Sequence, residues 1–299
     1  MARTGLVALV TGSSSGFGEL IAHTLARRGH QVYASMRDVA GRNAGPAQAM
    51  ERLARDKGLQ LCALELDVTN EASIKAAVAT VLAQAARIDI VVNNAGISAA
   101  GPIEAFSLQQ VRDIFDVNAF GPLRVNKAVL PAMRAQRSGL IIHISSTLGR
   151  VLPGAGGLYP ATKWALEGLA ESLSYQVTPF GIDVVILEPG AFPSPSISKA
   201  TMAADQDVTQ QYAEAASRAA RPPVQPGPDY REPDPQEVAD AVAALVDLPA
   251  GERPLRSVVG PIFTEGVPEY NEAYERTKAH LREVLRRPDQ AVTWGRPRP

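Results

Sequence analysis

Cysteine is almost absent from this sequence, which has one in 299 residues. Cys62 lies in the apolar segment LQLCALEL, where we expect a buried thiol. A single cysteine excludes the disulfide framework that holds many small secreted domains together, and it fits a reducing compartment. The opening residues, MART, lead into an apolar run without the pattern of a secretory signal, so we expect a cytoplasmic protein.

Three further features are missing. No apolar run reaches the roughly 18 residues needed to span a membrane, so we expect no membrane partner. The formal net charge of −1 gives no electrostatic reason to expect nucleic acid. The histidines have no metal-ligand spacing, so we expect no metal site; they are His23, His30, His143 and His280. A small-molecule substrate remains the expected partner.

Hydrophobic residues, in contrast, make up 45% of the chain, enough to bury one large core. Short continuous apolar runs alternate with segments that carry apolar residues at helical intervals. This alternation predicts the α/β class, with a doubly wound parallel sheet of about seven strands and helices on both faces. We expect a single domain over residues 1–299. The strands are expected near residues 5–11, 31–35, 60–66, 89–93, 139–145, 182–187 and 256–260.

The first expected strand passes directly into the glycine-rich segment TGSSSGFG and then into a helical pattern. Gly12, Gly16 and Gly18 permit a tight turn and a close approach of the backbone, and they leave the first amides of the helix directed at an anion. A dinucleotide pyrophosphate is the natural anion at such a turn. A glycine-rich turn without a ligand is the structural alternative.

A second pattern lies near the middle of the chain, where Ser146 precedes Tyr159 by thirteen residues and Tyr159 precedes Lys163 by four. Residues four apart share one face of a helix, so the ammonium is expected beside the phenol. A neighbouring cation favours phenolate, and we expect it to lower the pKa of Tyr159 toward the range of a general acid or base. Ser145 competes for the serine role, and the thirteen-residue spacing selects Ser146.

Together, TGSSSGFG, VVNNAG at residues 91–96, Asn118, Ser146 and YPATK resemble the shorter branch of the short-chain dehydrogenase/reductase family. The motifs occur in the family's order, and the resemblance extends to about residue 263. It implies a Rossmann-like fold, reversible hydride transfer to or from a nicotinamide cofactor, and a homodimer or homotetramer. It also implies catalytic roles for Asn118, Ser146, Tyr159 and Lys163. For Asn118 alone, an ordinary helix-disrupting polar residue is the alternative.

The resemblance also implies a set of cofactor contacts, some of which have structural alternatives. Asp67 resembles the family's aspartate beside the adenine, although its local chemistry also suits the cap of the following helix. Asn94 resembles the family's turn against the cofactor, with a plain strand-ending turn as the alternative. The full set is Gly12, Ser14, Ser15, Gly16, Phe17, Gly18, Arg37, Asp67, Val68, Asn94, Ala95, Gly96, Tyr159, Lys163, Pro189 and Gly190.

The end of the second expected strand, QVYASMRD, bears on the choice of cofactor. Family members that prefer NAD place an acidic residue at the position that aligns with Met36. The guanidinium of Arg37 suits the 2′-phosphate of NADP, so NADP is favoured over NAD. Asp38 is the alternative, because a shift of one residue in the alignment places its carboxylate at the ribose and reverses the preference. An Arg-Asp pair on a solvated turn is the structural alternative.

Two segments are expected to complete the substrate site. Residues 192–235 predict a lid insertion, with one or two helices followed by the proline-rich linker RPPVQPGPDYREPDP. A surface excursion without substrate contact is the alternative. Residues 264–299 predict a C-terminal helical extension and a solvated tail. The helix, VPEYNEAYERTKAHLREVLRR, is expected to close the pocket or to pack against a neighbouring subunit.

The expected substrate contacts are largely apolar. They are Ser146, Leu148, Leu152 and Phe192, with Ala99, Val151 and Leu158 completing the wall. This favours an NADP-dependent alcohol dehydrogenase or carbonyl reductase for a hydrophobic alcohol, ketone or aldehyde, similar to the family's steroid, retinol and ketoacyl enzymes. The alternatives are a reductase of small polar keto compounds and a non-catalytic NADP-binding sensor or scaffold protein.

Overall fold

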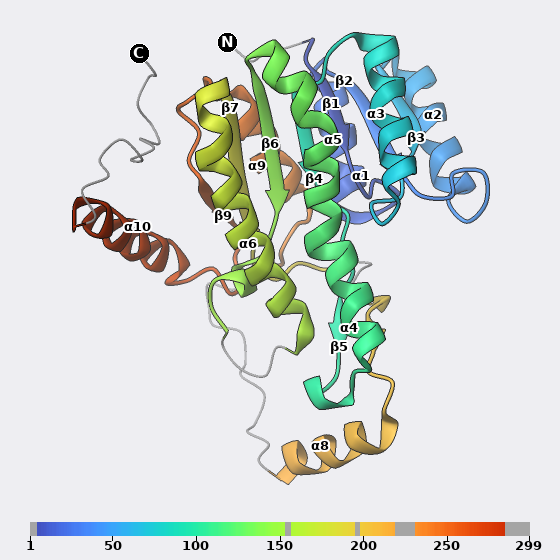
Figure 1. The fold of residues 1–299 in the computed structure, drawn as a ribbon. Helices are drawn as coiled ribbons and strands as arrows, with labels where there is room; N and C mark the ends of the chain where they lie inside the picture. Colours follow the sequence, from blue (N-terminus) through green and yellow to red (C-terminus); the bar gives the residue numbers. More distant parts are fainter. Residues whose placement is uncertain (1–4, 153–156, 195–197, 219–230, 285–299) are drawn as a thin grey trace.

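The fold is given by a computed structural model that describes residues 5–152, 157–194, 198–218 and 231–284. Its centre is a parallel sheet with the strand order β3-β2-β1-β4-β6-β7-β9 (Figure 1). This confirms the α/β, doubly wound prediction. The strands are β1 Val7–Val10, β2 Gln31–Met36, β3 Leu61–Glu65, β4 Ile90–Asn93, β6 Gly139–Ile144, β7 Ile182–Pro189 and β9 Arg256–Val259.

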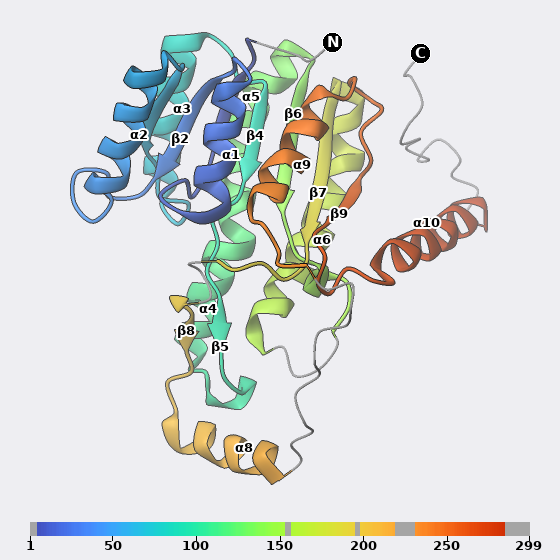
Figure 2. The same cartoon turned by 180° about the vertical axis from the view of Figure 1, so that it is seen from behind.

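Helices cover both faces of this sheet, as Figures 1 and 2 show from opposite sides. One face packs against α1 Gly16–Arg27, α2 Ala44–Lys57 and α9 Gln236–Asp247. The other packs against α3 Glu71–Ala85, α5 Gly121–Gln136 and α6 Leu158–Val177. In β1, Ala8 and Val10 join the first core while Val7 and Leu9 join the second. Burial on both faces explains why these strands are continuous apolar runs.

The chain order reverses between β1 and β4, because the chain leaves β1 toward β2 and β3 and later returns to the other side of β1. In open parallel sheets a crevice forms at such a reversal, beyond the carboxyl ends of the strands. The loops that follow β1, β4, β6 and β7 therefore meet at one edge of the sheet. These loops carry the sequence motifs that resemble the dehydrogenase family.

A smaller layer lies beyond this edge (Figure 1). It contains the short strands β5 Ala99–Ala100 and β8 Thr201–Met202, which pair in parallel, and the helices α4 Leu108–Phe115 and α8 Gln206–Arg218. Phe106, Ile114 and Ala203 belong to its separate apolar cluster. The helix expected in the insertion is present as α8, and residues 221–230 of the proline-rich segment lie outside the described residues.

The C-terminal extension contains α10, Val267–Val284, which matches most of the expected helix; residues 285–299 lie outside the described residues. The described residues also form four short helical turns, which are η1 Ile103–Ala105, η2 Asp116–Phe120, η3 Thr147–Gly149 and η4 Thr178–Phe180. No helix within the described ranges is both long enough and apolar enough to cross a membrane.

A buried ion pair ties β7 to the loop between α9 and β9. Asp183 accepts hydrogen bonds from Arg253 Nη1 at 2.7 Å and from the Gly251 amide at 2.9 Å. Arg253 also donates to the Leu245 carbonyl at 2.8 Å. Both charged side chains are almost fully buried, at 1% and 3% exposure. Removing one partner leaves the other as an uncompensated buried charge.

We predict that Asp183→Leu lowers the free energy of unfolding by about 3–5 kcal/mol, because it strands the Arg253 cation in the core. The double variant Asp183→Leu/Arg253→Met should recover part of this loss, since it removes both charges. Urea denaturation measures both effects. The single variant Arg253→Met completes the comparison. If the double variant loses as much free energy of unfolding as Asp183→Leu and Arg253→Met added together, the ion pair is not the cause.

Candidate active site

The glycine turn that joins β1 to α1 packs tightly against the end of β4. Gly12 has a φ of +68°, and a Cβ atom there would lie 2.7 Å from the Cα of Ala95. A Cβ on Gly18 would lie 2.4 Å from both the Asn94 Nδ2 atom and the Gly12 carbonyl oxygen. These contacts leave no room for larger residues, so the turn and the Asn94–Ala95 segment form one unit.

Hydrogen bonds between Thr11 and Asn94 hold this unit together. The Asn94 side-chain amide donates to the carbonyls of Thr11 and Gly12, at 2.9 and 3.1 Å. The backbone amides of Asn94 and Ala95 donate to the Thr11 hydroxyl, at 3.0 and 3.1 Å. These bonds tie the strand-ending turn at Asn94 to the glycine turn. Sequence reasoning missed Thr11, whose signal was its place directly before the first glycine.

The start of α1 presents backbone donors toward the same edge. Ser15 is the N-cap residue with extended geometry, and its side chain makes no capping hydrogen bond within the described part of the chain. The first amides of any α-helix have no acceptor within the helix, and they favour an anion. Ser14, Ser15, Gly16 and Phe17 are half-buried around this position. Together with Gly12 and Gly18, these residues suit a phosphate group.

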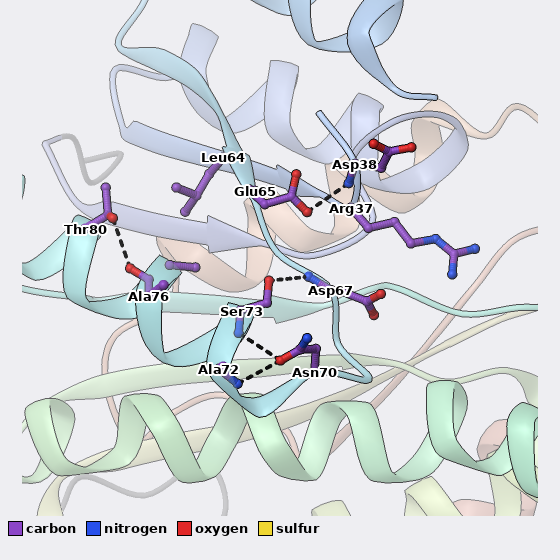
Figure 3. A pocket seen from close by; sticks show the side chains of 11 residues that line it. Arg37, Asp38, Leu64, Glu65, Asp67, Asn70, Ala72, Ser73, Ala76 and Thr80 are labelled. Carbon is purple, nitrogen blue, oxygen red and sulfur yellow. Dashed lines mark hydrogen bonds between the residues drawn. The ribbon is translucent and has the colours of Figure 1, made fainter. Parts of the chain in front are cut away.

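A pocket of about 760 Å³ lies farther along the edge, between the end of β2, the end of β3 and α3 (Figure 3). Arg37, Asp38 and Asp67 line it. The Asp67 carboxylate accepts hydrogen bonds from the amide and hydroxyl of Thr69, at 2.9 and 2.7 Å. The helix-cap alternative for Asp67 is wrong, because Asn70 caps α3 through bonds to the amides of Ala72 and Ser73.

Arg37 and Asp38 differ sharply in this pocket. The Asp38 carboxylate accepts from the Arg42 amide at 2.8 Å, and its own amide donates to Glu65 at 2.8 Å, so Asp38 serves its own loop. The Arg37 guanidinium is exposed and extends away from Asp38 in Figure 3. It has no hydrogen-bond or ion-pair partner among the residues that the structure describes. This cation is available to an anionic ligand.

Val68 lies next to this pocket, but its side chain does not line it. The side chain is 7% exposed and belongs to the core beneath α3 and α5. A Cβ atom on Gly121 would lie 3.0 Å from Val68 Cγ2, which shows how closely the start of α5 approaches. Any cofactor contact by Val68 would therefore come from its backbone.

The structure brings Ser146, Tyr159 and Lys163 together beyond β6. Ser146 follows β6 and caps η3 through a bond from the Leu148 amide at 3.1 Å. Its hydroxyl lies close enough to the Tyr159 phenol to lower the pKa of that group. The Lys163 Nζ atom lies 5.6 Å from the centre of the Tyr159 ring and donates to the Ile144 carbonyl at 2.8 Å.

Ser145 takes no part in this arrangement. Its amide donates to the Leu187 carbonyl at 2.8 Å, and its side chain is 3% exposed. A Cβ atom on Gly149 would lie 3.0 Å from the Ser145 hydroxyl and 3.2 Å from Glu167 Cγ, so this hydroxyl lies on the Glu167 side. The geometry agrees with the choice of Ser146.

The pKa values differ from the expectation. Burial raises the pKa of Tyr159 to about 12, and the effect of the nearby Ser146 hydroxyl offsets only part of this rise. The prediction that Lys163 lowers the tyrosine pKa is wrong for this structure, because the ammonium lies against the ring and the loss of solvent dominates. Burial also lowers the pKa of Lys163 to about 8, against the opposing effect of the Glu167 carboxylate.

Asn118 lies in a π-helical turn, η2, between α4 and α5. The side-chain amide donates to the Ile97 carbonyl at 2.9 Å and to the Thr162 hydroxyl at 3.0 Å, and it accepts from the Ile97 amide at 2.8 Å. A Cβ atom on Gly96 would lie 3.4 Å from its oxygen and 4.0 Å from Lys163 Nζ. Asn118 thus joins the loop after β4 to α6 next to Lys163, which is more than a helix-disrupting residue does.

The end of β7 completes this edge. Pro189 is buried, and its carbonyl accepts a 3.4 Å hydrogen bond from the Ser146 hydroxyl. The Gly190 amide donates to the Val259 carbonyl at 2.9 Å. A Cβ atom on Gly190 would lie 2.0 Å from the Ile262 carbonyl, so glycine is required there. The segment at 189–190 therefore lies directly beside the serine loop.

The expected substrate wall is only partly formed. Leu152 is 52% exposed and Leu148 is half-buried, so both are accessible. Phe192 is 5% exposed and packs edge-on against Phe17, with ring centres 5.6 Å apart. A Cβ on Gly260 would lie 2.5 Å from the ring of Phe192. The assignment of Phe192 to the wall is not supported, because its ring fills the core between α1 and β9.

The sequence and fold were compared with known proteins. A family model described as "short chain dehydrogenase" matches residues 6–205. The chain is 37% identical over 186 residues to a 3-ketodihydrosphingosine reductase of Bacteroides thetaiotaomicron, covering 62% of this chain and 64% of that protein. It is 38% identical over 193 residues to human retinol dehydrogenase 8, covering 64% and 60%. The chain thus spans less than two thirds of the length of both relatives.

A solved structure extends the comparison over more of the fold. This is a gluconate 5-dehydrogenase from Burkholderia cenocepacia in complex with NADP and tartrate. It superimposes with a TM-score of 0.69 at 26% sequence identity, covering 90% of this chain and 97% of that chain. The likeness therefore includes the sheet, its helices and the edge described above.

The lowered pKa of Lys163 generates a prediction about stability. In the unfolded chain the amine stays protonated up to its ordinary value of 10.5, whereas in the folded chain it loses its proton near pH 8. Between these values the unfolded state binds one more proton, so the free energy of unfolding rises with pH. The difference in this free energy between wild type and Lys163→Met should therefore move in favour of wild type from about pH 8 to about pH 10.5.

A series of urea denaturation curves at different pH values measures this trend. Lys127→Met, which replaces an exposed lysine on α5, serves as the control for the loss of one lysine. A difference between wild type and Lys163→Met that stays constant over the range would contradict the lowered pKa.

Proposed function

The chain belongs to the short-chain dehydrogenase/reductase family, and on that premise we propose that it transfers a hydride between NADP(H) and a hydrophobic alcohol, ketone or aldehyde. One observation carries the proposal. Ser146, Tyr159 and Lys163 lie together beyond β6, with Lys163 Nζ 5.6 Å from the centre of the Tyr159 ring and the Ser146 hydroxyl close enough to lower the Tyr159 pKa. A pair of hydroxyls backed by a buried ammonium is suited to proton transfer at a substrate oxygen.

In the proposed reaction, the bound nicotinamide supplies or accepts the hydride, and the chain's own residues handle the proton. Tyr159 has a pKa of about 12 and is protonated at neutral pH, so it donates a proton to a carbonyl oxygen that gains charge. The Ser146 hydroxyl orients that oxygen. Lys163, with a pKa of about 8, is largely cationic at neutral pH and stabilises the phenolate left by the transfer. The raised pKa keeps Tyr159 in its protonated form at neutral pH, which is the form that carbonyl reduction requires.

The donor groups of the edge support a dinucleotide with a 2′-phosphate. The glycine turn and the first amides of α1 suit the pyrophosphate, and the pocket with Asp67 lies farther along for the adenosine. Arg37 supports NADP over NAD, because its guanidinium is unpaired among the described residues and Asp38 is used within its own loop. The Burkholderia structure named above binds NADP.

The proposed substrate class rests on relatives and on exposed side chains. Two relatives are named for lipids, a ketodihydrosphingosine and retinol. Val151 and Leu152, directly after η3, are 39% and 52% exposed, and apolar side chains at this edge favour an apolar substrate. The Burkholderia neighbour, named for gluconate, keeps a small polar keto compound as the alternative. Tyr159 and Lys163 disfavour a non-catalytic sensor, which needs neither group.

We predict that Tyr159→Phe abolishes NADPH-dependent reduction, by about 10²-fold or more, while the affinity for NADPH changes little. The variant removes the proton donor and keeps the ring. An absorbance assay with a panel of hydrophobic and polar ketones and aldehydes measures turnover, and NADPH fluorescence measures affinity. Tyr33→Phe removes the same hydroxyl from β2, where it bonds to the Gln31 side chain, and should retain activity. Retained turnover in Tyr159→Phe would eliminate the proposed proton donor.

We further predict that Arg37→Ala weakens NADPH binding by about tenfold or more and NADH binding by much less, because a charge-assisted phosphate contact is lost. Fluorescence titration with both cofactors measures the two affinities. Arg42→Ala removes an exposed arginine from the same loop and should leave the ratio of affinities unchanged. Equal losses for NADPH and NADH in Arg37→Ala would contradict the phosphate contact.

A further inference from the structure

Helix α10 packs against the domain through polar and aromatic side chains. It follows β9, starts at the carboxyl edge of the sheet and lies beside α6 (Figures 1 and 2). The residues that face the domain are spaced by one helical turn: Asn271, Tyr274, Lys278 and Arg282. Lys278 donates to Glu171 at 2.6 Å and Arg282 to Tyr175 at 2.9 Å, both on α6. This helix lies beyond residues 6–205, which the family model matches.

Asn271 reaches two segments of the proposed active site at once. Its side-chain oxygen accepts a hydrogen bond from Arg150 Nε at 2.8 Å. Its side-chain amide donates to Glu188 Oε2 at 2.7 Å. Arg150 ends the loop that begins at Ser146, and Glu188 directly precedes Pro189 in β7. One side chain therefore connects the serine loop to the strand end at Pro189 and Gly190, which resembles the family's segment beside the nicotinamide.

Direct contact between these two segments is weaker than the contact through Asn271. The closest nitrogen and oxygen atoms of Arg150 and Glu188 are 3.8 Å apart, too far for a hydrogen bond. The strand ends themselves are paired, and the Ser145 amide donates to the Leu187 carbonyl at 2.8 Å. Beyond that pair, Ser146 donates to the Pro189 carbonyl through a longer bond of 3.4 Å. Asn271 supplies two shorter bonds between the side chains of Arg150 and Glu188, and so it holds the serine loop against the end of β7 beyond the paired strand ends.

Burial makes these two bonds costly to lose. The side chains of Arg150 and Glu188 are 5% and 0% exposed, so water has little access to either one. The Arg150 guanidinium also lies 4.9 Å from the Tyr270 ring centre and 4.7 Å from that of Tyr274, both on α10. A buried charged group that loses its partner is destabilised in its original position, and it shifts toward another partner.

From this geometry we propose that Asn271 is a positioning residue, which holds the serine loop and the end of β7 at the separation that the nicotinamide half of the cofactor requires. The inference rests on the proposed function, because it concerns the same site. It assigns α10 a role in shaping the active site from outside the region that the family model matches. The adenosine half of the cofactor, near Arg37 and Asp67, lies at the far side of the sheet's reversal and does not depend on Asn271.

Separate measurement of the two cofactor halves tests this role. Isothermal titration calorimetry is used with NADPH, which occupies both halves, and with 2′,5′-ADP, which occupies only the adenosine half. If the wild type binds NADH instead, NADH and 5′-AMP replace them. In Asn271→Leu we expect about a tenfold loss of affinity for the dinucleotide and less than about a twofold change for the adenosine fragment. A general loss of folding would weaken both ligands together.

Two further variants sharpen the experiment. Asn271→Asp keeps the side-chain volume but removes the N–H group that donates to Glu188, so it should show the same selective loss even if Asn271→Leu folds poorly. Glu272→Leu changes the neighbouring exposed residue of α10, whose contact is a surface pair with Arg276, and should bind both ligands like wild type. Unchanged dinucleotide affinity in both Asn271 variants, or an equal loss for both ligands, would overturn the positioning role. A wild type that binds neither dinucleotide would instead contradict the proposed function.

Discussion

Parallel pairing of strands that are buried on both faces is the constraint on which the rest of this structure depends. It places the carboxyl ends of β1, β4, β6 and β7 at one edge, although their loops are far apart in the sequence. Gly12, Asn94, Ser146 and Pro189 meet there because each directly follows or ends one of these strands. The sheet needs only apolar side chains to form, so the polar residues at its edge are left for chemistry.

Burying polar groups against such a core costs free energy of solvation, and the shifted pKa values reflect this cost. Burial moves the pKa of Tyr159 up to about 12 and that of Lys163 down to about 8, both toward the neutral form. His143 lies on β6 near Lys163, and burial lowers its pKa to about 3, so this histidine stays neutral. It contacts Asn126, which also bonds to Asn93 on β4 at 2.9 Å. His143, Asn126 and Asn93 are therefore all neutral, and Lys163 is the charged group next to Tyr159.

Much of the fold and the central triad could be predicted from the sequence because their signals are local. Continuous apolar strands mark the sheet, and the spacing from Ser146 through Tyr159 to Lys163 follows from a strand end and one helical turn. The failures involve distant contacts. Phe192 was expected in the substrate wall, but Phe17 and Gly260 enclose it in the core. The tyrosine pKa depends on burial by the whole domain, and Asn271 approaches Arg150 from 121 positions along the chain.

The contacts of α10 with the domain are polar, and this restricts the positions that the helix can take relative to the site. An apolar helix face gains free energy from area alone and tolerates small shifts, since the hydrophobic effect has no direction. Hydrogen bonds weaken steeply with angle and distance, so Asn271 can satisfy Arg150 and Glu188 together only over a narrow range of helix positions. Buried ion pairs add little net stability, because desolvation offsets their attraction. Arg256 lies 3.4 Å from Glu188 and 3.7 Å from Glu275 on α10, and so joins Arg150 and Glu188 in one buried cluster. This cluster is therefore better understood as fixing the orientation of α10 than as strengthening its attachment, and that orientation passes directly to Ser146 and Pro189.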